Sequence, residues 1–262
     1  MSKKNNWDNK SSARERLKVE REKEARRAKM RRQIYAVVGF VVVICAGAGI
    51  AVAVSKAGKS NAAPDDVVTY GNPNAKHTLH LYEDPRCPIC AAFEQEDGAQ
   101  IVKGADAGQY KIEYTFGTFL DKNDGGTGSM HALAAMDAAL HVSQKAFIEF
   151  HTALYSKANH PDESVDKLSD NSYLFGISNQ VPELKDNKTF QKAVEDGKYN
   201  SWAQKMSDSF NNSGVTGTPT AKVDGKNFAV TGFTNPNNNP PEGIIPLGQF
   251  TQGLDKAFGI KG

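Results

Sequence analysis

Apolar and polar residues alternate along segment 110–116, and this period of two predicts a β-strand. An apolar stretch at 77–82 predicts an earlier strand, and segment 67–70 predicts a short strand before it. Segment 220–231 predicts a β-hairpin, because the Asp-Gly pair inside it favours a two-residue turn. The predicted strands therefore form an early group and a late group.

Between these groups, apolar residues recur every three or four positions, which predicts amphipathic helices around a common core. A further helix is predicted to begin at 91–96, directly after the strand at 77–82, and another closes the chain. Segment 121–129 is rich in Gly, Asn and Asp and predicts a loop, with Ser129 as the cap of the next helix. The later helices are expected at 130–142, 144–156, 164–176, 178–184, 187–211 and 244–258, with a Pro- and Asn-rich loop at 235–241.

Segment 34–54 is uncharged and long enough to cross a membrane. At about 1.5 Å per residue a helix here reaches about 32 Å, close to the roughly 30 Å hydrocarbon core of a bilayer. Lys and Arg crowd its N-terminal side, which predicts a cytoplasmic N-terminus and places everything after Val54 outside the cytoplasm. A cleaved signal peptide is the alternative, since Ala51-Val52-Ala53 is typical of a cleavage site.

Charge is distributed unevenly along the 262 residues, although the net charge is only +2. Residues 1–33 are dense in Lys and Arg, so the rest of the chain is acidic overall, which argues against a nucleic-acid-binding core. The basic segment is predicted to be a solvated cytoplasmic tail, or alternatively to bind anionic lipid headgroups. Residues 55–66 are small and polar and predict a flexible linker to a domain at 67–262.

Cys87-Pro88-Ile89-Cys90 lies where the strand at 77–82 turns into a helix. Backbone N–H groups and the helix dipole stabilise a thiolate at such a turn. Pro88 fits the first helical turn, where its missing N–H costs nothing, and Ile89 adds no charge. The spacing and position favour redox chemistry.

Half a zinc site and a purely structural disulfide remain the alternatives for the cysteine pair. No second CxxC or HxxxH follows the pair, and the nearby His77 and His80 belong to the preceding strand. The third cysteine, Cys45, lies inside the apolar segment and is interpreted as a small apolar filler. We expect no metal and no organic cofactor.

Thr218-Pro219 enters the first strand of the predicted hairpin and is a candidate cis-proline site. With the CPIC motif and the helical segment between them, the GVTGTPT sequence at 214–220 resembles the DsbA-like branch of the thioredoxin superfamily, over roughly 67–262. The resemblance implies an α/β, thioredoxin-like fold with a helical subdomain inserted at about 129–212.

The resemblance also implies thiol–disulfide exchange, with Cys87 as nucleophile, Cys90 as resolving thiol and Thr218-Pro219 facing the pair. Substrates would be unfolded or exported proteins with cysteines, and a membrane redox partner would reoxidise the pair. An oxidase is favoured by the oxidising compartment. An isomerase, a reductase, and a non-enzymatic binding or metal-carrier module stay open.

One departure from the family concerns the buried acid that relatives often carry six residues before the first cysteine, where this chain has Leu81. Glu83 and Asp84 lie nearer the motif, and Asp84 matches a common family position. Either could have a proton-transfer or electrostatic role, and a solvated loop or a helix cap is the alternative.

Overall fold

The computed structural model describes residues 67–230 and 247–260. The expected tail at 1–33, membrane segment at 34–54, linker at 55–66 and loop at 235–241 lie outside the described residues. Within the part that is described, no helix is both long and apolar enough to span a bilayer.

A five-stranded sheet forms the centre of the described domain, in the order β1-β3-β2-β4-β5. β2 and β3 run parallel, whereas β1 with β3, β2 with β4, and β4 with β5 are antiparallel. The strands are β1 (Val68–Tyr70), β2 (Thr78–Glu83), β3 (Lys111–Phe116), β4 (Thr220–Val223) and β5 (Lys226–Phe228). All five coincide with segments that the sequence predicts as strands, although β2 extends one residue beyond the predicted 77–82, to Glu83.

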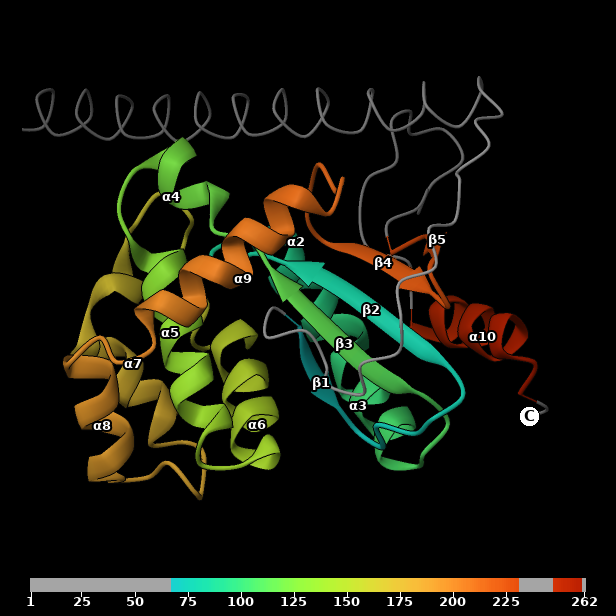
Figure 1. Ribbon diagram of the computed structural model, residues 1–262, viewed down its shortest axis with the longest axis horizontal. Helices are drawn as coiled ribbons and strands as arrows, with labels where there is room; N and C mark the ends of the chain where they lie inside the picture. The colour runs from blue at the N-terminus through green and yellow to red at the C-terminus, as the bar shows by residue number, and fades with distance from the viewer. Residues whose placement is uncertain (1–66, 231–246, 261–262) are drawn as a thin grey trace, which may run out of the picture. The chain divides into compact units, whose positions relative to one another are not determined.

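Two groups of helices accompany the sheet (Figure 1). After β2 come α2 (Pro88–Phe93), the π-helical turn η1 (Glu94–Gly98) and α3 (Ala99–Asp106), and the C-terminal α10 (Leu247–Phe258) packs against α3, η1 and β4. The second group separates β3 from β4, which confirms the predicted helical insertion. It consists of α4 (Phe119–Asp124), α5 (Gly128–Leu140), α6 (Gln144–Tyr155), the 3₁₀ turn η2 (Lys167–Ser169), α7 (Asn171–Ser178), α8 (Lys188–Glu195) and α9 (Asn200–Asn212).

Alternate side chains of the parallel strand pair point into the core, as the period of two requires. Leu79 and Leu81 on β2 are buried, and so are Ile112, Tyr114 and Phe116 on β3. These strands end next to each other, since Glu83 lies opposite Phe116 in the register. The end of β2 therefore carries the CPIC turn out of the middle of the sheet.

The hairpin turn has the conformation that its sequence predicts. Asp224 and Gly225 both have positive φ, at 47° and 79°. Two successive positive φ values are the mark of a type I′ turn, whose twist matches that of the adjoining strands. β4 pairs with β2, whose end leads into the cysteine turn. The Thr218-Pro219 segment directly before β4 therefore lies next to Cys87.

The expectation for 121–129 is wrong in part, because α4 extends to Asp124 and α5 already begins at Gly128. Ser129 lies inside α5 and does not cap it. Two carboxylates accept hydrogen bonds from the free N–H groups of residues 127–130 instead: Asp121 on the preceding helix α4 and Asp166, which is remote in sequence. A cap from elsewhere in the fold leaves no local pattern in the sequence.

Three helix predictions in the insertion are also wrong in their bounds. Segment 164–176 contains the 3₁₀ turn η2 followed by α7, which continues to Ser178. The helix expected over 187–211 is interrupted at Gly197, whose φ of 60° ends α8 before α9 begins. Of the helix expected over 178–184, Ser178 is the last residue of α7 and 179–184 form turns, where Pro182 lacks the N–H that a continuing helix would need.

Candidate active site

Cys87 is the N-cap residue of α2, and Cys90 lies one turn further along the same helix. The Cys87 N–H donates to the Asp84 carbonyl oxygen at 2.9 Å, which closes the turn that follows β2. Pro88 occupies the first helical position, as predicted, and Ile89 packs against the core. Both cysteines are free thiols, and Cys87 is 7% exposed whereas Cys90 is fully buried. Cys87 is therefore the thiol that a partner meets first.

The two thiols differ in how readily they ionise. A hydrogen bond from Cys90 holds the pKa of Cys87 below its ordinary value, against the opposing effect of burial. Burial raises the pKa of Cys90 well above its ordinary value. Cys87 is the stabilised thiolate, and Cys90 keeps its proton.

The peptide bond between Thr218 and Pro219 is cis, as the sequence predicts. The Cys87 thiol donates to the Thr218 carbonyl oxygen at 3.6 Å. The Thr218 hydroxyl oxygen is buried close by and has no hydrogen-bond partner of its own among the described residues. A segment from the far end of the chain thus contributes directly to the environment of the nucleophile.

Glu83, at the end of β2, is fully buried, and burial raises its pKa to about 8. Its Oε2 atom lies 2.8 Å from Nε2 of His151, and Oε2 of Glu94 lies 3.9 Å from Nδ1 of the same ring. Burial also raises the pKa of Glu94 well above its ordinary value and lowers that of His151. Glu83 is close enough to the cysteines for its charge to raise the pKa of Cys90.

Glu94 and His151 are site residues that the sequence analysis missed. His151 lies four residues after Phe147 and four before Tyr155, on a helix face that is otherwise aromatic. A histidine at the same helical spacing as these buried aromatic residues could have indicated that His151 is buried. Glu94 carried none, because it enters the core through the π-helical turn η1, which reorients side chains in a way that helical spacing does not predict.

Among the described residues, Glu83, Glu94 and His151 form a group whose possible metal-ligand atoms all lie within 4.8 Å of one another. The histidines nearest the cysteines in sequence have other partners. His77 Nδ1 is 2.8 Å from an Asp224 carboxylate oxygen, and His80 Nε2 is 2.9 Å from the Thr115 hydroxyl.

Asp84 is fully buried beneath the cysteine turn, so the solvated-loop alternative is wrong for it and for Glu83 alike. Its carboxylate accepts hydrogen bonds from the Ser129 hydroxyl at 2.6 Å, the Arg86 N–H at 3.0 Å and the Leu120 N–H at 3.2 Å. Burial raises its pKa to about 6, although these donors oppose the shift. Asp84 joins the cysteine turn to α4 and α5.

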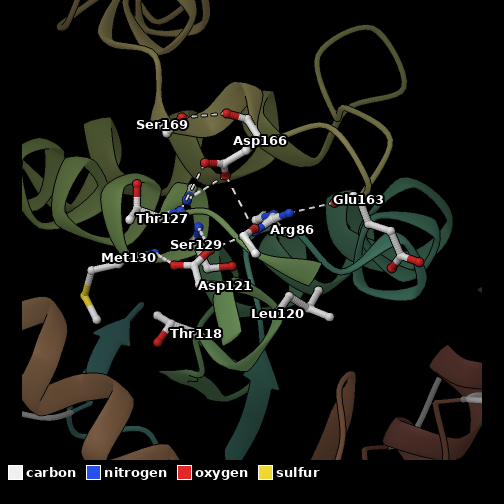
Figure 2. Close-up of polar contacts among 12 residues, drawn as sticks. Arg86, Thr118, Leu120, Asp121, Thr127, Ser129, Met130, Glu163, Asp166 and Ser169 are labelled. Atoms are coloured by element: carbon white, nitrogen blue, oxygen red, sulfur yellow. Dashed lines mark hydrogen bonds and ion pairs between the residues drawn. The ribbon is translucent and has the colours of Figure 1, made fainter. Parts of the chain in front are cut away.

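Arg86, directly before Cys87, fastens the same turn to the helical insertion (Figure 2). Its side chain is 2% exposed and donates to Asp121 at 2.9 Å and to the carbonyl oxygens of Gly125 and Glu163 at 2.8 and 2.7 Å. Asp166 lies 3.5 Å from the same guanidinium group. One buried cation therefore holds two separate loops of the insertion against the residue that precedes the nucleophile.

Replacing Arg86 with Met is expected to lower the free energy of unfolding by about 3 kcal/mol, the lower end of the range for breaking a buried ion pair. The lower end applies because Asp121 and Asp166 are 14% and 29% exposed. Urea unfolding measures the loss. Lys192→Met, which breaks an exposed pair with Asp196, is the control and should have little effect on the free energy of unfolding, because solvent screens an exposed pair. Equal losses in both variants would contradict this account of Arg86.

The thioredoxin family model matches residues 63–237, so the chain belongs to the thioredoxin family. No curated protein sequence matches it. Its fold is shared by solved disulfide oxidoreductases.

Three of these structures show the extent of the similarity. Oxidised DsbA from Mycobacterium tuberculosis is 24% identical with a TM-score of 0.58, covering 74% of this chain and 93% of that one. DsbG from the same organism, a disulfide bond oxidoreductase in its reduced form, is 25% identical with a TM-score of 0.55, covering 76% and 95%. Oxidised BdbD from Bacillus subtilis is 20% identical with a TM-score of 0.56, covering 73% and 92%.

Proposed function

We propose that this protein is an extracytoplasmic thiol–disulfide oxidoreductase that oxidises cysteine pairs in unfolded or exported proteins. The observation that carries the proposal is the asymmetry of the pair: Cys87 caps α2 with a lowered pKa, and Cys90 is buried behind it with a raised one. A stabilised Cys87 thiolate favours the reduced form, which makes the disulfide a stronger oxidant. DsbG, which shares the fold, is described as a disulfide bond oxidoreductase, and this description supports the proposal.

The reaction begins with a Cys87–Cys90 disulfide. A substrate thiolate attacks Sγ of Cys87, the bond between the two cysteines breaks, and its electron pair leaves on Cys90. Cys90 then takes a proton from Glu83, whose pKa of about 8 keeps it largely protonated at neutral pH. A second substrate thiolate attacks the substrate sulfur of the mixed disulfide, and the Cys87 thiolate departs. Two substrate thiols become one disulfide, and the protein gains two electrons.

In this proposal, residues 34–54 anchor the domain to a membrane with residues 1–33 in the cytoplasm. The uncharged length of the segment and the Lys and Arg residues before it support this orientation. A membrane redox partner then reoxidises the reduced pair. No nucleic acid, metal or organic cofactor takes part.

Equilibration of the full chain with glutathione buffers tests the proposal. We expect a potential near about −120 mV, which is typical of a strong dithiol oxidase. A value near about −270 mV would instead identify a reductase. If the cysteine pair does not cycle between thiols and disulfide and the protein binds zinc or copper tightly and stoichiometrically, the protein is a binding or metal-carrier module and not an oxidoreductase.

A further inference from the structure

His151 brings a side chain of the helical insertion into the space behind the cysteine pair. It lies on α6, and its ring contacts Glu83 of β2 at 2.8 Å and approaches Glu94 of η1 to 3.9 Å. The side chains of Glu83 and His151 are 0% exposed, and that of Glu94 is 4% exposed. Three elements from different parts of the chain therefore enclose two carboxyl groups and one imidazole away from bulk solvent.

This group leaves several polar atoms without hydrogen-bond partners. Oε1 of Glu83, Oε1 of Glu94 and Nδ1 of His151 are all buried and unpaired. Burying unpaired polar groups is costly, and two carboxylates this close in a dry site cannot both be ionised. A proton held between the two carboxyl groups removes most of this cost.

The aromatic residues around His151 hold its ring in one place. Tyr114 and Tyr155 each lie 4.9 Å from it between ring centroids, and Phe116 and Phe147 lie at 5.9 and 6.0 Å. Burial keeps the imidazole neutral, so it has one ring proton to donate. With that proton on Nε2, His151 donates to Glu83 and leaves Nδ1 facing Glu94.

We propose that His151 is a positioning residue that holds Glu83 and Glu94 around one shared proton, so that the helical insertion sets the proton supply to Cys90. The inference rests on the proposed function and extends it from one acid to a unit of three residues. When Cys90 leaves as a thiolate, Glu83 gives it the proton, and the resulting carboxylate keeps hydrogen bonds from His151 and the Glu94 carboxyl. When Cys90 later attacks, the same proton returns to Glu83.

Other titratable groups face this unit from every element that surrounds it. Each interacts electrostatically with Glu83, Glu94 or a cysteine of the pair and contributes to the expected pH dependence. They are Cys87 and Cys90 on α2, Asp84 after β2, Asp97 on η1, Tyr114 on β3 and Tyr155 on α6. A variant at His151 leaves all of these groups in place.

The test follows the resolving step itself. The reduced full chain is mixed with oxidised glutathione and quenched with acid, and mass spectrometry separates the mixed disulfide on Cys87 from the final Cys87–Cys90 disulfide. The decay rate of the mixed disulfide rises with pH until Glu83 is ionised and then levels off, which gives a bend in the pH profile.

His151→Phe keeps a flat ring in the aromatic site but removes the donor to the Glu83 carboxylate. We expect the bend to move up by about one pH unit, since a lost hydrogen bond to a charged group is worth at least that much. His151→Gln restores a donor and should restore the bend. His141→Phe, at the C-cap histidine of α5 with a 55% exposed side chain, is the matched control and should leave the bend unchanged.

An unchanged bend in His151→Phe, or an equal shift in His141→Phe, would overturn the inference while the proposed function stands. Equimolar zinc in the purified full chain that is lost in His151→Phe would also overturn it, because the three residues would then be ligands. If His151→Phe does not fold, Glu94→Met takes its place, with the same upward shift expected and an unchanged bend counting against us. A wild-type chain that never forms the Cys87–Cys90 disulfide would refute the proposed function itself.

Discussion

Replacing Cys87 with Ser is expected to slow disulfide exchange by roughly a thousand-fold or more, because no other described thiol is placed to attack a disulfide. Cys87 caps α2 and faces the Thr218 carbonyl oxygen, whereas Cys90 is fully buried. Cys90→Ser should have a different effect: Cys87 still attacks, but the mixed disulfide persists because the resolving thiol is gone. Mass spectrometry of each variant after incubation with oxidised glutathione distinguishes the two results.

Cys45→Ser is the matched control for these variants, since it removes the third cysteine of the chain and leaves the CPIC pair intact. We expect it to exchange disulfides at the wild-type rate. Retained exchange in Cys87→Ser would mean that Cys90 or Cys45 is the nucleophile. A mixed disulfide that resolves at the normal rate in Cys90→Ser would exclude Cys90 as the resolving thiol.

The parts of the site that could be predicted from sequence are those fixed by local geometry. A strand followed by CPIC defines a helix N-terminus, and Pro88 at its first position needs only the constraints of its own ring. The hairpin after Thr218-Pro219 is equally local, because the Asp-Gly pair alone selects the turn. Resemblance to a family then joins these two distant segments, and the sheet between them confirms that they meet.

The parts that could not be predicted depend on contacts between distant segments. Arg86 precedes the motif like any surface arginine, and only the folded insertion brings Asp121, Gly125 and Glu163 around it. Glu83 likewise reads as a charged residue at the end of a strand, until α6 closes over it with His151. Burial of this carboxyl group results from the packing of distant elements, so the residues next to Glu83 in the sequence do not indicate it.

Replacing Glu83 with Gln is expected to change how the stability of the reduced protein depends on pH. The pKa of Glu83 is about 8 in the folded protein against 4.5 for the ordinary group. Between these values the folded state keeps a proton that the unfolded chain has released, so wild-type stability falls as pH rises, by about 1.4 kcal/mol per pH unit. Gln is isosteric with the protonated acid and removes this dependence.

The free energy of unfolding of Glu83→Gln should therefore increase relative to that of the wild type as the pH rises. The expected relative gain is roughly 3 kcal/mol between about pH 5.5 and pH 8. Urea unfolding of both reduced proteins across this range measures the gain. Some decline with pH remains in the variant, because burial also raises the pKa of Asp84, to about 6, and that of Glu94. Glu195→Gln, at an exposed carboxylate on α8, should run parallel to the wild type. If Glu83→Gln also runs parallel, Glu83 is ionised in the folded protein at neutral pH and cannot supply the proton that Cys90 requires.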